Sequence, residues 1–388
     1  MKYSQSVLVR VATAGALAMM AVACGSSKPA ASDGAENSAS QAGSNSATAS
    51  ATSADASAGG STSPSAAAPT ATDVVRIGDL GVVSDAPFYI AEDLGFFKQQ
   101  GIEVKMTRFA SSPAVIAPLT QGQIDVAGGS PTAGLYNAIG LGSGFKIVAD
   151  KAKTPKGFGY NGLIIRKDLW DSGVKDLAAL KGKTIAILGG KGSSSDAGLY
   201  RAATDLNLKL GDFKVITMAA PDLPAAFANK AIDAAVAIEP QLTQLVASGA
   251  AVVWERMDQY YPDHQMGLVL YSEKFIAAHP EAASGFMTAY LQAARYYTDA
   301  FVKGDAAKRA EVVKILIAHT TVKDPKLYDS MAMAYIDPNG VINVDTMNAD
   351  QKYFVSEGAQ DKVVDLSKSI DMSFANNAVK ALGPYDAG

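Results

Sequence analysis

The feature that most constrains the fold is a regular alternation of short apolar segments with segments of helical periodicity, which begins near residue 73. β-Branched and apolar residues bounded by turn signals are typical of buried strands, and they predict three strands, at 74–80, 102–109 and 124–127. Apolar residues at helical spacing predict helices over 86–100 and 113–121. Because strands that alternate with helices favour parallel pairing, the sequence predicts an α/β lobe.

The same alternation returns in the second half of the chain. It predicts strands at 184–188, 213–218 and 232–238, each followed by a helix, starting at Ala197, Leu223 and Pro240. The segment GQIDVAGGSP at 122–131 is similar to KAIDAAVAIEP at 230–240, since both place Ile-Asp at a strand entry and end at a proline that starts a helix. Further strands are expected at 145–152, 162–167, 251–255 and 267–271.

A chain of this length exceeds one ordinary hydrophobic core, so we expect residues 73–388 to form two lobes joined by a hinge. Lobe 1 would comprise approximately residues 73–160 and 265–388, and lobe 2 approximately residues 161–264. Beyond Ser272 the pattern predicts mainly helix. We expect this C-terminal tail to pack mostly against lobe 1.

The N-terminal segment predicts export from the cytoplasm. Lys2 and Arg10 flank the start of an apolar run at 11–22, which is too short to span a bilayer and is typical of a signal peptide. The ending Ala21-Val22-Ala23-Cys24 resembles the lipobox of bacterial lipoproteins. That resemblance implies that residues 1–23 are removed and that Cys24 carries a lipid anchor, such as palmitate. The alternative is an ordinary signal peptide with a chance cysteine.

Residues 24–72 would then connect the anchor to the folded part. Residues 26–72 are nearly all Ser, Ala, Thr and Gly, so they bury too little apolar surface to offset their chain entropy, and we expect a disordered linker. The chain would reside in the cell envelope, on the outer side of the cytoplasmic membrane, either in a periplasm or at the cell surface.

The composition argues against several function classes. A net charge of -4 argues against nucleic acid, which needs a basic surface. Cys24 is the only cysteine, so no disulfide is expected within the chain. The sequence holds three histidines and no HExxH, CxxC or GxSxG motif. We therefore expect no metal, no cofactor and no catalytic residue, and a chain that is not an enzyme.

Small hydroxyl residues and glycines recur where a predicted strand meets a predicted helix. They occur at 84–85, 111–112, 129–132 and 192–195. A helix N-terminus offers unpaired amide donors and partial positive charge, so such junctions attract carboxylates, sulfonates and phosphates, and in α/β sheets these ligands bind beyond the carboxyl ends of strands. The alternative role for each serine is ordinary N-capping.

Four segments together resemble the substrate-binding proteins of the nitrate/taurine/sulfonate class of bacterial ABC importers, which includes SsuA-like proteins. They are residues 76–105, 122–135, 176–202 and 221–240. The resemblance implies a bilobal periplasmic-binding-protein fold (type II-like) with two doubly wound lobes, closure on a small solute, and delivery to a membrane permease with a separate ATPase. The protein would act as a monomer.

The expected ligand-binding residues come from the junctions, the resemblance and one predicted crossing between lobes. They are Ser84, Asp85, Ala86, Ser111, Ser130, Thr132, Tyr160, Asn161, Ser193, Ser194 and Glu239. Tyr160 would add stacking and Asn161 an amide contact. Glu239 has an alternative role in holding the turn before Pro240. If Asp85 faces the ligand, the solute also carries an amino or hydroxyl donor.

The expected solute is a small organic anion such as a sulfonate or a taurine-like compound. The alternatives are an aminopyrimidine, riboflavin or another vitamin precursor, nitrate, or an aromatic carboxylate. A remote alternative is an enzyme that resembles the pyrimidine synthase of thiamine biosynthesis, which relies on clustered cysteines and a histidine. A ligand-sensing surface protein that signals through a partner is a further class, which the sequence does not separate from transport.

Overall fold

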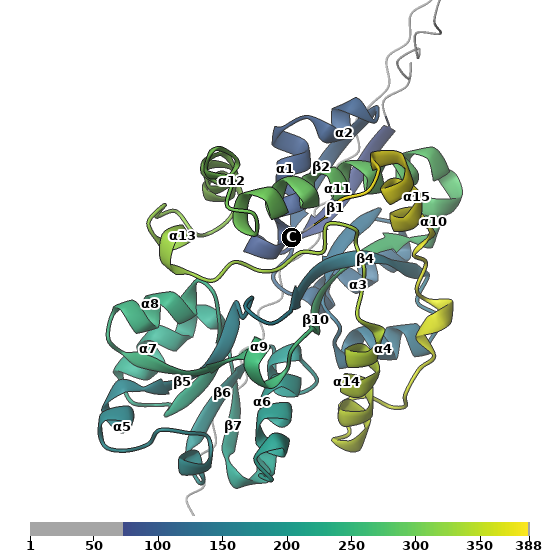
Figure 1. Cartoon of the computed structure of the whole chain (residues 1–388). Helices are drawn as coiled ribbons and strands as arrows, with labels where there is room; N and C mark the ends of the chain where they lie inside the picture. The colour runs from purple at the N-terminus through teal and green to yellow at the C-terminus, as the bar shows by residue number, and fades with distance from the viewer. Residues whose placement is uncertain (1–72, 387–388) are drawn as a thin grey trace, which may run out of the picture. The chain divides into compact units, whose positions relative to one another are not determined.

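The computed structural model describes residues 73–386, which form two five-stranded sheets, each flanked by helices (Figure 1). We call the first sheet with its helices lobe 1 and the second lobe 2. The predicted signal peptide (1–23), the lipidated Cys24 and the linker (24–72) lie outside the described residues. Among residues 73–386, no helix is both long enough and apolar enough to cross a membrane.

Lobe 1 contains the sheet β2-β1-β3-β10-β4. Its strands are β1 (Asp73–Asp79), β2 (Ile102–Arg108), β3 (Val126–Gly129), β4 (Phe145–Thr154) and β10 (His264–Ser272). β1 pairs in parallel with β2 and β3, whereas β10 runs antiparallel to both β3 and β4.

Lobe 2 repeats this plan in the sheet β7-β6-β8-β5-β9. Its strands are β5 (Asn161–Arg166), β6 (Thr184–Leu188), β7 (Lys214–Met218), β8 (Ala234–Ile238) and β9 (Ala251–Arg256). β6 is parallel to β7 and β8, and β5 is antiparallel to β8 and β9. β5 and β10 thus run antiparallel to their neighbours, whereas the predicted parallel pairing concerned the strands that alternate with helices. Each of these strands enters its sheet directly from a crossing between lobes, at the edge where the parallel strands end.

The helices that precede the C-terminal tail are short, and most of them follow a strand. They are α1 (Ala86–Asp93), α2 (Phe96–Gln99), α3 (Ile116–Gln121), α4 (Ala133–Gly140), α5 (Lys167–Asp171), α6 (Ser194–Asp205), α7 (Leu223–Ala228), α8 (Gln241–Ala247) and α9 (Met257–Tyr260). The single helix predicted over 86–100 is two helices, because Gly95 adopts a left-handed conformation between them. The helix predicted from Ala197 begins three residues earlier, where Ser193 caps it.

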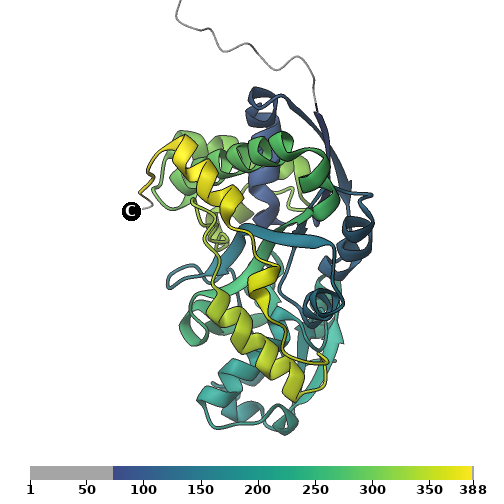
Figure 2. The ribbon, with the colours of Figure 1, turned by 90° about the vertical axis from the view of Figure 1, so that its right-hand side faces the viewer.

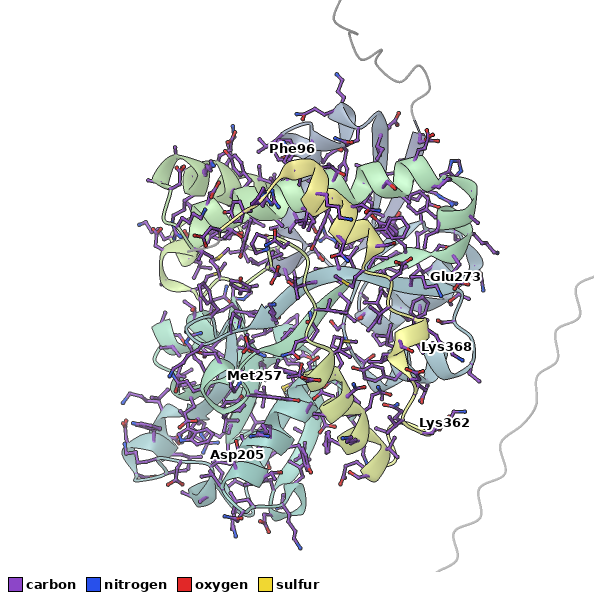
Figure 3. The ribbon with its side chains drawn as sticks, turned by 45° about the vertical axis from the view of Figure 1, so that its right-hand side comes forward. Phe96, Asp205, Met257, Glu273, Lys362 and Lys368 are labelled. Atoms are coloured by element: carbon purple, nitrogen blue, oxygen red, sulfur yellow. The ribbon has the colours of Figure 1, made fainter. Side chains whose placement is uncertain are left out.

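The tail is helical, as predicted, and its helices are α10 (Glu273–Ala278), α11 (Pro280–Phe301), α12 (Ala306–His319), α13 (Leu327–Ser330), α14 (Val344–Ser356) and α15 (Ser373–Leu382). α11 lies over lobe 1, where Phe286 and Tyr290 pack against Phe88 of α1 in a fully buried cluster. Side chains fill the interior around these helices, while Lys362 and Lys368 lie on the outside of the loop after α14 (Figure 3).

The tail also contacts lobe 2, in addition to the predicted packing against lobe 1. α14 descends beside α4 and α6, as the yellow-green helix in Figure 2 shows. Tyr353 of α14 stacks on Tyr200 of α6 with 3.9 Å between ring centroids, and α13 contacts α8. The tail therefore links the lobes in addition to the crossings at 155–160 and 257–263.

A buried carboxylate, Asp150 of β4, ties the tail to the sheet of lobe 1. Its Oδ1 accepts a hydrogen bond from Gln265 Nε2 at 2.6 Å, and its Oδ2 accepts one from the backbone N–H of Asp337 at 2.8 Å. Burial raises the pKa of Asp150 to about 7, although these hydrogen bonds and Lys153 oppose the shift. The carboxyl group consequently holds its proton in the folded state at pH values where the unfolded chain has lost it.

We expect this proton to make stability pH-dependent. Between about pH 4 and pH 7 the native state binds more protons at Asp150 than the unfolded state, so stability falls as pH rises through this range and levels off above it. Urea unfolding gives the free energy of unfolding of the wild type and of Asp150→Asn. The difference in favour of the wild type should be larger at about pH 5 than at about pH 8. The exposed Asp222→Asn serves as the control, and an advantage that does not change with pH would contradict the assignment.

Candidate ligand-binding site

A cavity of about 320 Å³ lies between the lobes, at the edges where the parallel strands of both sheets end. Most of the residues predicted for the site line it, namely Ser84, Ser111, Ser130, Thr132, Tyr160, Asn161, Ser193 and Ser194. The arrangement follows from topology, because loops that leave the carboxyl ends of parallel strands meet at one edge of a sheet. Asp85, Ala86 and Glu239 are not part of the lining.

Lobe 1 contributes serines and threonine from the loops after β1, β2 and β3. Ser112 Oγ accepts a hydrogen bond from the backbone N–H of Ser130 at 2.6 Å, which joins two of these loops. Thr132 Oγ1 accepts the N–H of Leu135 at 3.2 Å and so caps α4. Thr132 therefore caps a helix and lines the cavity at once, and its hydroxyl hydrogen remains a donor for a ligand.

Lobe 2 contributes the N-terminus of α6. Ser193 caps this twelve-residue helix by accepting the N–H of Asp196 at 3.2 Å, and it donates its own hydroxyl hydrogen to Leu188 O at 2.8 Å. The neighbouring Ser194 Oγ is buried and has no hydrogen-bond partner among the described residues. The helix terminus adds partial positive charge to this wall of the cavity.

The sequence analysis missed Lys151 of β4, which is the main charged group in the lining. Its side chain is only 2% exposed, and its Nζ donates to Asp85 Oδ1 at 2.6 Å and to Ser84 Oγ at 2.9 Å. An ammonium group has three N–H donors, so one remains for a ligand. A lysine inside a strand that is otherwise buried is the signal that could have identified it, because lysine is almost never buried without a partner.

Gly128 of β3 leaves the space that this ion pair occupies. A Cβ atom at Gly128 would lie 2.9 Å from Asp85 Oδ1 and 3.1 Å from Lys151 Cδ. Any larger residue would push against both partners. Gly128 is therefore needed for packing of the charged pair.

Asp85 is not among the residues that line the cavity, and the structure gives its carboxylate partners within the protein. Its carboxylate is fully buried and accepts the N–H groups of Leu80 and Val82, at 2.9 and 3.2 Å, in addition to Lys151. These bonds shape the loop after β1. Ala86 is also fully buried, at the start of α1, and packs in the core of lobe 1.

Glu239 makes its hydrogen bonds within the protein, in line with the structural role that the sequence offered as an alternative to ligand binding. Its Oε2 accepts the N–H of Thr243 at 3.0 Å in the first turn of α8. Its Oε1 accepts from Arg256 and from the backbone N–H of Ala332, both at 3.2 Å. Glu239 thus joins β8, β9 and the tail behind the cavity, and its carboxylate is satisfied by the protein.

Asn161 and Tyr160 reach the cavity from the crossing that enters lobe 2. Asn161 is 2% exposed, and its Nδ2 donates to the thioether sulfurs of Met257 and Met266, at 3.2 and 3.8 Å. The rest of the lining is largely apolar and includes Leu80, Val82, Pro113, Leu188, Ile238 and Met266. The lining holds two lysines, Lys151 and Lys191, but no carboxylate, histidine or cysteine. Such a cavity can hold an organic anion.

Comparison with known proteins agrees with this architecture. A protein of Bacillus subtilis (strain 168), whose name assigns it to the binding of aliphatic sulfonates, is 27% identical over 318 residues, which cover 79% of this chain and 88% of that protein. The crystal structure of the periplasmic aliphatic sulphonate-binding protein SsuA of Escherichia coli is similar, with a TM-score of 0.63, 19% identity, and coverage of 78% of this chain and 99% of that one. The periplasmic nitrate-binding protein NrtA of Synechocystis PCC 6803 gives a TM-score of 0.59 at 19% identity, with coverage of 81% and 90%.

These similarities confirm the predicted bilobal periplasmic-binding-protein fold and its nitrate/taurine/sulfonate-type class. The model of the NMT1-like family matches residues 68–317, which is more than half of the chain. The chain therefore belongs to the NMT1-like family.

Proposed function

We propose that this protein is the solute-binding component of an ABC importer, which captures a small organic anion between its lobes and delivers it to a permease served by a separate ATPase. The observation that carries the proposal is Lys151, a buried ammonium group that lines the cavity with a donor to spare. The family and the sulfonate-binding relative support the solute-binding role. In this proposal the protein binds and releases its solute unchanged and acts as a monomer.

The charge balance of the cavity favours an anion. Asp85 neutralises Lys151, so the protein can bury the lysine before a ligand arrives. Lys191 and the N-terminus of α6 also carry positive charge at the cavity, which Glu357 and Asp196 offset in part from outside the lining. Ligand anions would bind Lys151 through a charge-assisted hydrogen bond.

The apolar lining favours an organic solute over nitrate. Residues such as Leu188, Ile238 and Met266 would bury a hydrocarbon body, which an inorganic anion lacks. The aminopyrimidine alternative drew on Asp85, Glu239 and Tyr160 as recognition groups. Tyr160 lines the cavity, but both carboxylates are engaged by the protein. A synthase-like enzyme would need cysteine and histidine in the site, and the lining contains neither.

The proposal includes the lipid anchor at Cys24, on the outer side of the cytoplasmic membrane. Two observations support it: the sequence resembles a lipobox, and the structural relatives SsuA and NrtA are periplasmic proteins. Mass spectrometry of the protein from membranes should find a diacylglyceryl group at Cys24, and Cys24→Ala should release the protein from the membrane fraction.

Removal of the charged pair should abolish anion binding. Lys151→Met alone would leave Asp85 buried without its partner, so the double variant Lys151→Met/Asp85→Asn is preferable because it removes both charges. We expect its affinity for propanesulfonate and benzenesulfonate, measured by calorimetry, to fall about 10- to 100-fold. Lys146→Met, on the same strand but paired with Glu273 at the surface, is the control and should bind as the wild type does. A folded double variant with unchanged affinity would overturn the anion site.

Closure between lobes depends on a backbone contact at Gly192. The Gly192 carbonyl of lobe 2 accepts the N–H of Ala133 of lobe 1 at 2.9 Å, beside the cavity. A Cβ atom at Gly192 would lie 2.6 Å from Ala133 Cβ and 3.2 Å from Ala359 Cβ. A larger residue would therefore hold the lobes apart at this point.

We accordingly expect Gly192→Ala to weaken anion binding by about tenfold or more, because closure would require the two loops to move apart. Gly182→Ala is the matched control, since Gly182 has a similar φ (76° against 79°) and open space around it. Both variants carry the same cost of a left-handed alanine, about 1–2 kcal/mol. Calorimetry gives the anion affinity of each variant, and unfolding curves give its stability. If the two variants bind the anion equally well, the Gly192 contact does not determine closure.

A further inference from the structure

One residue that lines the cavity carries a hydrogen-bond acceptor that the protein leaves unmatched. Asn161 lines the cavity at the start of β5, and its Oδ1 is buried without a hydrogen-bond partner among residues 73–386. A buried carbonyl oxygen without a donor costs about 1–3 kcal/mol, so native structures rarely leave one in this state without a functional reason.

The orientation of the Asn161 amide follows from its chemistry. Its Nδ2 points to the sulfurs of Met257 and Met266, which come from α9 and β10. Thioether sulfurs accept hydrogen bonds and cannot donate them. A reversed amide would bring Oδ1 to two groups that have no hydrogen to offer, so the carbonyl oxygen is the free end of this side chain.

The position of this acceptor complements that of the buried ammonium group. Lys151 belongs to lobe 1 and offers a donor to an anionic group, whereas Asn161 belongs to lobe 2 and offers an acceptor. Ser194 Oγ, also in lobe 2, is a second buried polar atom without a partner and can either donate or accept. The same lining contains apolar residues such as Leu188, Ile238 and Met266.

We propose that the solute is an organic anion that also carries an N–H or O–H group, which donates a hydrogen bond to Asn161 Oδ1 while the anionic group binds Lys151. This proposal rests on the proposed function and narrows its substrate class. It assigns Asn161 as the residue that discriminates against anions without a donor, such as unsubstituted alkanesulfonates. Such ligands would leave Oδ1 buried and unpaired after the lobes close.

The test uses ligand pairs that differ by one hydroxyl group. They are propanesulfonate with hydroxypropanesulfonate, and benzenesulfonate with para-hydroxybenzenesulfonate. Calorimetry on the purified wild type should show, in at least one pair, a preference of about 10- to 100-fold for the hydroxyl-bearing member. Asn161→Leu, which keeps the approximate volume and removes the acceptor, should lose that preference by weakening only the hydroxyl-bearing member.

Controls separate this inference from the anion site. Asn229→Leu, at an exposed position of lobe 2, should keep the wild-type preference, and Lys151→Met/Asp85→Asn should weaken both members of a pair alike. Should Asn161→Leu fold poorly, Asn161→Ala removes the same acceptor in a smaller side chain. Unfolding curves of each variant show which one to use.

The outcomes are distinguishable. Equal binding of both members to the wild type, as expected if water satisfies Asn161 Oδ1, would overturn the inference and leave the anion site standing. A preference for the hydroxyl-bearing anion that persists in both Asn161 variants would also overturn the inference and leave the anion site standing. Failure of all four anions to bind the wild type would overturn the proposed function and this inference with it.

Discussion

The ion pair between Lys151 and Asp85 is the interaction on which the rest of the cavity depends. Both side chains are almost completely buried, and breaking such a pair by removing one partner costs about 3–5 kcal/mol. Asp85 holds the loop after β1 through Leu80 and Val82, and Lys151 belongs to β4, so the pair connects opposite parts of the lobe 1 sheet. The same pair provides the cavity with a buried N–H donor, because a lysine neutralised by its partner can still donate to a ligand.

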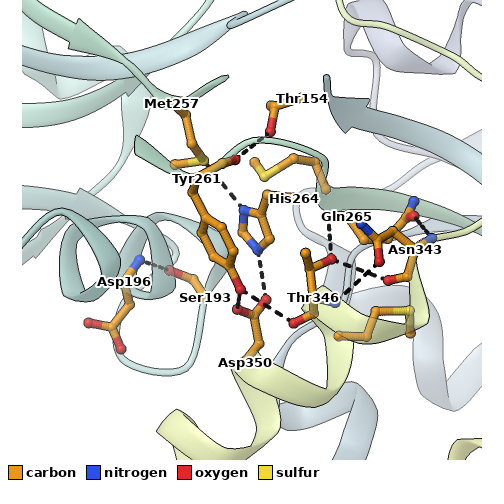
Figure 4. A network of polar contacts seen from close by, with 12 residues as sticks. Thr154, Ser193, Asp196, Met257, Tyr261, His264, Gln265, Asn343, Thr346 and Asp350 are labelled. Carbon is orange, nitrogen blue, oxygen red and sulfur yellow. Dashed lines mark hydrogen bonds and ion pairs between the residues drawn. The ribbon is translucent and has the colours of Figure 1, made fainter. Parts of the chain in front are cut away.

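A second buried network connects the two lobes through the tail. His264, the first residue of β10, lies with Nε2 at 2.7 Å from Asp350 of α14, and Tyr261 donates to the other oxygen of the same carboxylate at 2.7 Å (Figure 4). Gln265 accepts the N–H of Asn343 at 2.7 Å and donates to Asp150. The start of β10 and the crossing before it are thus hydrogen-bonded to the tail. A movement of one lobe relative to the other must therefore involve α14 as well.

Much of the site could be predicted because hydroxyl residues at strand-to-helix junctions combine two local signals. Ser130, Thr132, Ser193 and Ser194 follow strands and precede helices, and the topology of parallel sheets brings such positions to one edge. The two acids were harder to place. Asp85 and Glu239 are at the same kind of junction, but the direction of a carboxylate depends on partners distant in sequence, which for these residues are Lys151 and Ala332.

The sequence by itself determined the class of the fold, because strand and helix periodicities and turn signals are local properties of the chain. It also indicated the location of the junctions that line the cavity. Only the tertiary structure decided the pairing of Lys151 with Asp85, the antiparallel course of β5 and β10, and the contact of the tail with lobe 2. Each of these joins residues far apart in sequence, and their energies depend on burial and on partner geometry that no local pattern encodes. The tertiary structure also decided that Asn161 Oδ1 has no hydrogen-bond partner, because the absence of a partner can be established only when all neighbouring residues are placed.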